Sequence, residues 1–228
     1  FVVSKFGPVA IFMLLTRTFA SYGVEHLKPA VAYVILTVVL LLIFLIFCYP
    51  AYITVFAHLN PFKFAKKITR VAVFGFSTSS SAATLPLNVK TTVEELGVDE
   101  KIASFVLPLG MTINMNGTAI MQVIATLFIA GCAGYSISFT QLVVIALLAL
   151  IASAGTPAAP GSGAIILFTI LSGLGYVNDA AMLAYSLILA INRPIEMLVT
   201  ALNVVGDSAT SIYVAKSEGV LNEDVYNA

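Results

Sequence analysis

The chain has 228 residues, of which 60% are hydrophobic and only 10% are charged. A typical soluble domain is roughly 45–50% apolar and about 25% charged, so this composition excludes a water-soluble globular protein and also a disordered chain. Eleven basic and eleven acidic residues give zero formal net charge, which argues against a nucleic-acid partner. Cys48 and Cys132 both stand in apolar runs, where we expect small buried side chains rather than a disulfide or a zinc site.

Six apolar units follow one another along the chain, each long enough to cross or enter a bilayer. They cover about residues 5–21, 30–57, 64–89, 102–130, 140–175 and 180–215. No basic n-region and small-residue cleavage site precede the first unit, so we expect no signal peptide. Because the chain begins with Phe1, we expect it to be the C-terminal part of a longer protein. The pattern predicts an all-α membrane protein.

The basic residues indicate an orientation, since cytoplasmic loops are enriched in lysine and arginine. A basic cluster follows the second unit, formed by Lys63, Lys66, Lys67 and Arg70. If the third and fifth units are re-entrant hairpins, which enter and leave on one side, then Lys90, Lys101 and Lys216 lie on the same side as this cluster. Single spans would place Lys90 and Lys101 opposite it. The rule therefore favours hairpins, a multi-pass protein of the cell membrane and a cytoplasmic C-terminus.

Two apolar units are interrupted by similar small, polar stretches, at residues 78–86 and 153–163. Irregular backbone at membrane depth is costly unless it is buried or lines a wet cavity. Paired interruptions are typical of inverted-repeat transporters with the site at the repeat interface. Helix N-termini there would favour an anion, and free carbonyls a cation. The alternative is a small-residue packing interface, against which Pro157 and Pro160 argue.

Polar residues also interrupt the fourth and sixth units. The stretch Asn114–Thr118 offers hard oxygen donors and predicts a sodium site, the alternative being an interhelical hydrogen-bond cluster. In the sixth unit a spacing of 3, 4, 3 and 4 puts five side chains on one helix face: Arg193, Glu196, Thr200, Asn203 and Asp207. Ionisable groups inside a membrane are functional by default, although Arg193 and Glu196 can simply pair with each other. Asp207 has no basic residue within one turn and needs a cation or a proton.

Three segments, LPLGMTINMNGTA, ASAGTPAAPGSGAI and LNVVGDSATSIYVAKSEG, together resemble the dicarboxylate/amino acid:cation symporter family, the glutamate transporter homologues. The resemblance runs from the family's fifth transmembrane helix to its C-terminus. It implies an elevator-type, inverted-repeat fold with two re-entrant helical hairpins, assembled as a homotrimer in the lipid bilayer. Residues 1–58 would be two scaffold-side helices and residues 59–228 the transport domain. That domain would comprise a hairpin at 61–95, a broken helix at 102–132, a hairpin at 139–177 and a final amphipathic helix at 179–216.

The resemblance also implies the binding residues, with sodium as the coupling ion, no other cofactor and no catalytic residue. Substrate contacts would come from Ser80, Ser81, Thr118, Ala158, Ala159, Gly161, Glu196, Val199, Thr200 and Asn203. One sodium site would use Gly110, Asn114, Asn203 and Asp207. A second would use, mostly through backbone carbonyls, Thr112, Met115, Ser153, Ala154 and Thr156. Asn116 stands where the family usually has an aspartate, which removes a negative charge from a third, deeper cation site.

Departures from the family bear on the substrate. Val199 replaces the arginine of acidic-amino-acid carriers, Ser79 stands where the family's alternative arginine lies, and Glu196 replaces the aspartate that holds the substrate's amino group. An apolar wall does not stabilise a carboxylate, so Val199 predicts sodium-coupled symport of a small neutral amino acid. The alternative is an acidic amino acid or C4-dicarboxylate, sodium- or proton-coupled, with Arg193 pointing about 120° away from Val199 around the helix.

Two other classes of protein, a channel and an enzyme, fit the sequence less well. A channel would reuse the carbonyl-rich interruptions as a filter, but two hairpins and an acidic stripe favour a site that can be occluded. An enzyme is disfavoured because the chain contains no G-x-S-x-G or H-E-x-x-H pattern.

Overall fold

The computed structural model describes residue 16 and residues 27–228; the predicted unit at about 5–21 lies outside them apart from residue 16. Every regular element in residues 27–228 is helical, which confirms the all-α prediction. The elements are α2 (Leu27–Ile43), η2 (Phe44–Cys48), α3 (Tyr49–Phe56), α4 (Pro61–Thr78), α5 (Ser81–Glu94), α6 (Glu100–Ile113), α7 (Asn116–Cys132), α8 (Phe139–Ala154), α9 (Ser162–Leu174), α10 (Asp179–Ile191), α11 (Arg193–Ser217) and α12 (Glu223–Asn227).

Three helical stretches of the described chain are long and apolar enough to cross a bilayer. The first, Ala30–Phe56, runs through α2, η2 and α3, the second is Glu100–Cys132, and the third is Arg193–Ser217. Large apolar side chains such as Phe47 and Phe105 are exposed on the outside, as expected where the surroundings are lipid rather than water. These features support a multi-pass membrane protein.

The same apolar exterior overturns the expectation for the two cysteines. Cys48 and Cys132 are free, as their apolar context indicated, but both are exposed rather than buried. A membrane helix can be apolar all round, so an apolar neighbourhood in the sequence does not distinguish the packed face from the outer one.

Two antiparallel helix pairs correspond to the predicted hairpins at 61–95 and 139–177. Asn60 caps α4 and Ser138 caps α8, each with a side-chain oxygen that accepts a backbone N–H. Between α4 and α5 only Ser79 and Ser80 are non-helical, a stretch shorter than the predicted 78–86, because Ser79 adopts a left-handed φ of 50° that reverses the chain at once. We call residues 79–80 the first tip and residues 155–161, between α8 and α9, the second tip.

The two tips meet, although they lie far apart in the sequence. The Ser80 hydroxyl donates to the Ala158 carbonyl oxygen at 2.9 Å, and the Ala82 amide reaches the same oxygen at 3.4 Å. Ala158 is therefore the point at which the second tip is joined to the first.

The fourth and sixth units each contain a break. The fourth divides into α6 and α7 at Asn114 and Met115, as its polar stretch predicts. The final helix, expected to be continuous over 179–216, is instead divided at Asn192 into α10 and α11. Pro194 explains this difference, since proline has no N–H to donate and its ring crowds the carbonyl four residues earlier.

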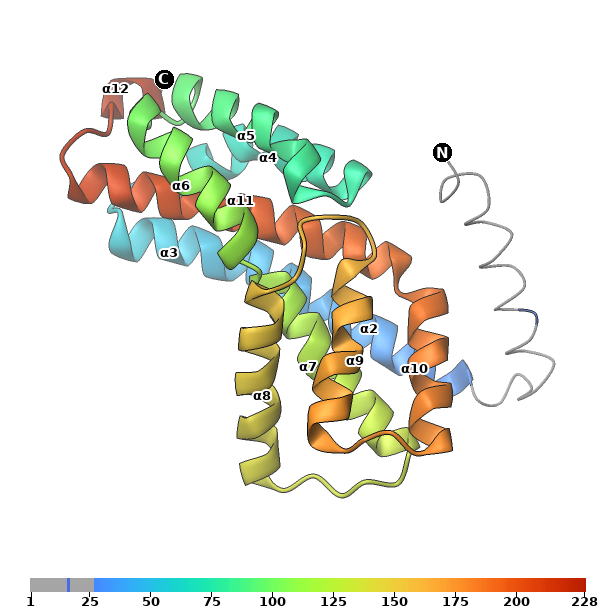
Figure 1. The fold of residues 1–228 in the computed structure, drawn as a ribbon. Helices are drawn as coiled ribbons and strands as arrows, with labels where there is room; N and C mark the ends of the chain where they lie inside the picture. The colour runs from blue at the N-terminus through green and yellow to red at the C-terminus, as the bar shows by residue number, and fades with distance from the viewer. Residues whose placement is uncertain (1–15, 17–26) are drawn as a thin grey trace.

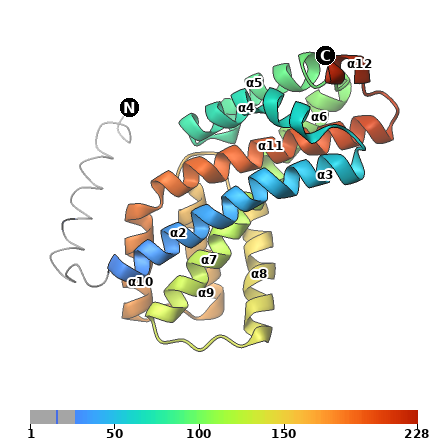
Figure 2. The same ribbon diagram turned by 180° about the vertical axis from the view of Figure 1, so that it is seen from behind.

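Helix α11 is the centre of the fold. Figures 1 and 2 show α4, α5 and α6 on one side of it, α7 to α10 on the other, and the α2–α3 helix running alongside it. Tyr33 in α2 donates to the Asn192 side chain at 2.7 Å. A Cβ at Gly206 would overlap the hydroxyl of Tyr49, so glycine allows α3 to approach α11 closely. Residues 30–56 thus pack directly on α11, and the predicted boundary at residue 58 stays a prediction.

The C-terminal helix α12 packs against the base of α4. Lys67 Nζ donates to the carbonyl oxygens of Glu95, Val225 and Tyr226 at 2.7–2.9 Å. The Tyr226 hydroxyl donates to the Asn60 carbonyl at 2.9 Å, and burial raises the pKa of this hydroxyl to about 12. Lys67 of the basic cluster and the C-terminus therefore lie at the same end of the molecule, while the orientation in the membrane stays a prediction.

Candidate functional site

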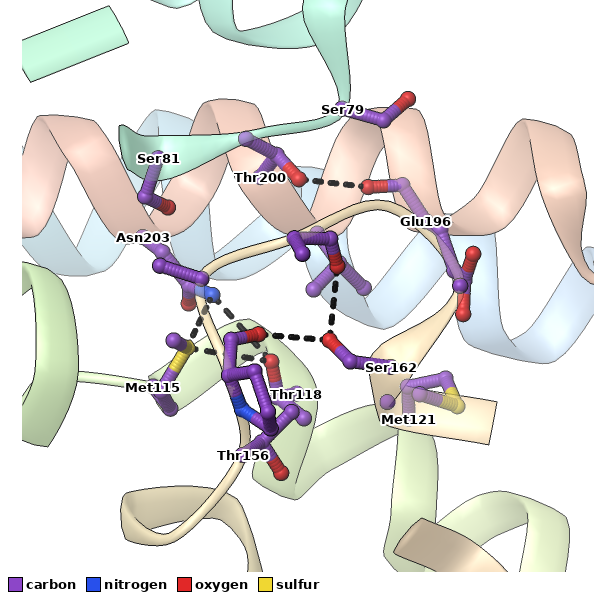
Figure 3. A pocket seen from close by; sticks show the side chains of 16 residues that line it. Ser79, Ser81, Met115, Thr118, Met121, Thr156, Ser162, Glu196, Thr200 and Asn203 are labelled. Carbon is purple, nitrogen blue, oxygen red and sulfur yellow. Dashed lines mark hydrogen bonds between the residues drawn. The ribbon is translucent and has the colours of Figure 1, made fainter. Parts of the chain in front are cut away.

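A small cavity lies where the two tips meet α7 and α11 (Figure 3). Its volume is about 30 Å³, which is room for roughly two water molecules. Its walls are mostly small or polar side chains: Ser79, Ser81, Met115, Thr118, Met121, Thr156, Pro157, Ala158, Ala159, Gly161, Ser162, Gly163, Glu196, Val199, Thr200 and Asn203.

Helix α11 supplies the one charged residue of the cavity wall, Glu196, whose exposure is only 7%. One carboxylate oxygen accepts the backbone N–H of Ala164 at 3.2 Å. The other lies 3.6 Å from an Arg193 guanidinium nitrogen, which is the pair that the spacing predicts. The Arg193 side chain is 49% exposed and does not line the cavity. The buried carboxylate is thus directed at α9 and paired with a half-exposed arginine.

After Glu196, helix α11 contributes an apolar residue to the cavity wall, Val199, and then polar ones that include Asn203. Val199, 5% exposed, is the apolar part of the wall. Asn203 joins α11 to the start of α7, since its oxygen accepts the Gly117 N–H at 2.8 Å and its nitrogen lies 3.2 Å from the Thr118 hydroxyl and 3.3 Å from the Met115 sulfur. The amide side chain of Asn203 therefore joins the break between α6 and α7 to α11.

A second polar cluster lies one turn beyond, around Asp207, which is 2% exposed. Asn114 Nδ2 donates to the Asp207 carboxylate at 2.8 Å and lies 3.3 Å from the Asn203 carbonyl oxygen. A Cβ at Gly110 would come within 2.6 Å of the same carboxylate, so glycine leaves room there. The residues predicted for one sodium site therefore converge. Because the carboxylate's hydrogen-bond partner is a neutral amide, its buried charge still requires a cation or a proton.

The amide of Asn116 extends this cluster toward α3. Its nitrogen donates to the Asn114 side-chain oxygen at 2.7 Å and to the Tyr49 hydroxyl at 3.3 Å. Neutral hydrogen bonds therefore link Asn114, Asn116 and Tyr49, and none of these three side chains carries a carboxylate.

The residues predicted for the other sodium site do not converge through their side chains. The hydroxyls of Thr112 and Ser153 donate to carbonyls of their own helices at 2.8 and 3.0 Å, and that of Thr156, in the second tip, donates to a carbonyl at the end of α8 at 2.9 Å. Thr112 and Ala154 are exposed, whereas Met115 faces the cavity. This site, formed through backbone carbonyls, stays a prediction.

All the predicted substrate-binding residues line the cavity except Ser80. The Ser80 hydroxyl is engaged elsewhere, since it donates to Ala158 and accepts the Ala83 N–H at the start of α5. The prediction missed several lining residues, which are Ser79, Met121, Pro157, Ser162 and Gly163. Met121 lies one turn after Thr118 on the same face, so helical spacing would have found it.

A family model described as the sodium:dicarboxylate symporter family matches residues 1–217. The chain is 31% identical, over 97% of its length, to the proton/sodium-glutamate symport protein of Bacillus caldotenax. It is 32% identical, over 91% of its length, to excitatory amino acid transporter 1 of Homo sapiens. It spans 51% of the first relative and 38% of the second, so about half or less of each.

Proposed function

Because the chain belongs to the sodium:dicarboxylate symporter family, we propose that it forms the substrate-binding and ion-binding part of a sodium-coupled amino acid symporter. This is a transporter family, so transport is favoured over the enzyme and channel alternatives. The proposal is supported most directly by the cavity, whose wall contains a buried carboxylate and the first residues of two helices.

The cavity offers both signs of charge that an α-amino acid requires. Glu196 is the partner for the ammonium group. Helices α5 and α9 begin at the cavity, with Ser81 and Ser162 in its wall, and the free N–H groups of a helix start favour a carboxylate. One small zwitterion would thus satisfy groups that come from α5, α9 and α11 together.

The Asp207 cluster is the proposed sodium site. The Asp207 carboxylate, the Asn114 side-chain oxygen and the Asn203 carbonyl are hard oxygen donors, which suit an alkali cation better than nitrogen or sulfur ligands do. Asn203 contributes its side chain to the substrate cavity and its carbonyl to this cluster. A shared residue gives sodium and substrate a direct physical connection.

For the substrate's side chain, we propose an acidic amino acid. Both reported relatives are named for glutamate or excitatory amino acid transport, which favours the acidic alternative over the neutral amino acid that Val199 predicts from the sequence. The cation beside the Glu196 carboxylate is Arg193, whose fork of five donors suits a carboxylate. A neutral amino acid remains the second candidate, because Val199 is buried in the wall where the family's arginine is missing.

The membrane arrangement belongs to the same proposal. The α4–α5 and α8–α9 pairs would be re-entrant hairpins, the second of them the extracellular gate, in an elevator-type homotrimer of the cell membrane with a cytoplasmic C-terminus. The charge pattern of the basic cluster and the meeting of the two tips support this arrangement.

A substrate panel tests the proposal. The full-length protein is reconstituted in liposomes, and uptake of radiolabelled glutamate, aspartate, serine, alanine and succinate is measured with and without an inward sodium gradient. We expect glutamate or aspartate uptake that requires the gradient, and a loss of at least tenfold in Arg193→Ala. Sodium-driven serine or alanine uptake that is indifferent to Arg193 would instead establish the neutral candidate. Uptake of none of the panel would refute the proposal.

A further inference from the structure

The two helices that begin at the cavity are capped in different ways. Helix α5 is capped by its own N-cap residue, since Ser80 accepts the Ala83 N–H. Helix α9 begins after Gly161, which has no side chain and makes no side-chain cap. The Ser162 hydroxyl does not compensate, because it donates back to the carbonyls of Pro157 and Ala159 within the tip. The start of α9 therefore depends on groups from other helices.

Three side chains from three helices hold the first turn of α9. The amide of Gln122 in α7 donates to the Gly163 carbonyl at 3.1 Å, and the hydroxyl of Tyr185 in α10 donates to the Ala164 carbonyl at 3.1 Å. The carboxylate of Glu196 in α11 accepts the Ala164 N–H. Glu196 is the charged member of this set, and a negative charge at a helix N-terminus is stabilising. It supplies from α11 the cap that Gly161 cannot supply.

The cavity beneath this turn must enlarge before an amino acid can enter, because its 30 Å³ holds only about two waters. Seven of the sixteen residues in the wall come from the second tip and the start of α9. The bond between Glu196 and Ala164 joins α11 to the start of α9, which belongs to this wall; Figure 3 shows Glu196 beside the second tip.

We propose that Glu196 is a latch that holds the second tip closed on α11, and that the ammonium group of the substrate competes with α9 for this carboxylate. The inference rests on the proposed function for its substrate. An incoming amino acid pairs with Glu196 and so releases the Ala164 N–H for another acceptor, such as the substrate's own carboxylate. Glu196 is in this sense a positioning residue for the gate as well as a ligand.

Two substitutions separate these roles. Glu196→Asp keeps the charge for the ammonium group but shortens the side chain by one methylene, so its carboxylate no longer reaches Ala164. Glu196→Gln keeps the length but loses the charge. The latch predicts that Glu196→Asp opens the tip more often without substrate and binds amino acids about fivefold more tightly, since no internal bond competes. Glu196→Gln keeps the tip closed and binds at least tenfold more weakly.

Tyr185→Phe is the matched control. It removes a neutral hydrogen bond to the same turn of α9, and Tyr185 does not line the cavity. Because this bond does not involve the carboxylate, its loss leaves amino acid affinity within about twofold of the wild type.

Spin labels on the full chain measure the opening of the tip. In a background with Cys48 and Cys132 replaced, labels are attached through Pro160→Cys on the second tip and Thr210→Cys on α11, both exposed positions. Distance distributions are recorded in sodium without amino acid, and binding is then titrated with glutamate and with serine. A longer-distance population in Glu196→Asp, together with tighter binding, supports the latch. A distribution unchanged from the wild type, or tighter binding also in Tyr185→Phe, overturns it.

Uptake by the wild-type protein in liposomes separates the latch from the proposed transport function. Absent uptake would refute the proposed function, whereas the distance distributions report on the latch without any transport.

Discussion

Replacing Asp207 with asparagine changes the charge of the candidate sodium site and little else. The side chains have nearly the same shape, and the oxygen of an asparagine can still accept the Asn114 amide. Since Asp207 is 2% exposed, water compensates little for its charge. The substitution therefore isolates the electrostatic contribution of this carboxylate to cation binding.

The expected loss of sodium affinity in Asp207→Asn follows from the burial of this carboxylate. Two unit charges about 4 Å apart interact by about 4 kcal/mol at an effective dielectric constant of about 20. Loss of that attraction corresponds to roughly a thousandfold weaker sodium binding. The fold itself should not suffer, because Asp207→Asn also removes an uncompensated buried charge. We therefore expect unchanged or slightly higher thermal stability in sodium-free buffer and almost no further stabilisation by sodium.

A sodium titration of the unfolding temperature measures the stability of the sodium-free protein and its further stabilisation by sodium. It uses the full-length protein in detergent, with choline replacing sodium to keep the ionic strength constant. The control is Glu218→Gln, which removes an exposed acidic charge just after α11 and should leave the titration unchanged. A sodium affinity of Asp207→Asn within about threefold of the wild type would refute the assignment of this carboxylate to a cation.

Three further substitutions test the cavity wall, the helix packing and the C-terminal contact. Val199→Arg places a cation in the apolar wall and should raise the preference for glutamate over serine at least tenfold, as measured by competition for uptake; an unchanged ratio would remove Val199 from the side-chain pocket. Gly206→Ala forces a Cβ against the Tyr49 hydroxyl and should destabilise the protein by about 2 kcal/mol or more, read as a lower unfolding temperature, with wild-type stability contradicting the packing. Tyr226→Phe leaves the Asn60 carbonyl with only the longer bond from the Phe64 N–H, at 3.4 Å, and should cost about 1 kcal/mol, or about 3 °C in Tm; no shift would show that this contact is dispensable.

Much of the helical arrangement follows from local signals in the sequence. Polar residues in apolar runs located the break at Asn114, and the spacing from Arg193 to Asp207 placed one polar stripe on one helix. Where the structure differs from the predicted helix boundaries, a single residue explains each difference. Pro194 divides the final helix at Asn192, and Ser79 reverses the chain in the left-handed region, a conformation that few non-glycine residues adopt.

The contacts between distant segments were not predictable in the same way. Periodicity identifies a face but not the partner of that face, so the approach of Tyr49 to Asn116 and the capping of α9 by Glu196 needed the three-dimensional structure. The same limitation explains the cysteines, because an apolar run in a membrane protein has no hydropathy difference between its packed and outer sides.

The most direct test of the central claim, that sodium and substrate are coupled in one site, is concentrative uptake. Liposomes containing the full-length protein are given equal glutamate inside and outside together with an inward sodium gradient, and the steady-state ratio of internal to external glutamate is measured. We expect a ratio well above one that collapses when a sodium ionophore is added and that does not develop in Asp207→Asn. A ratio of one in the wild type under the same gradient would contradict it.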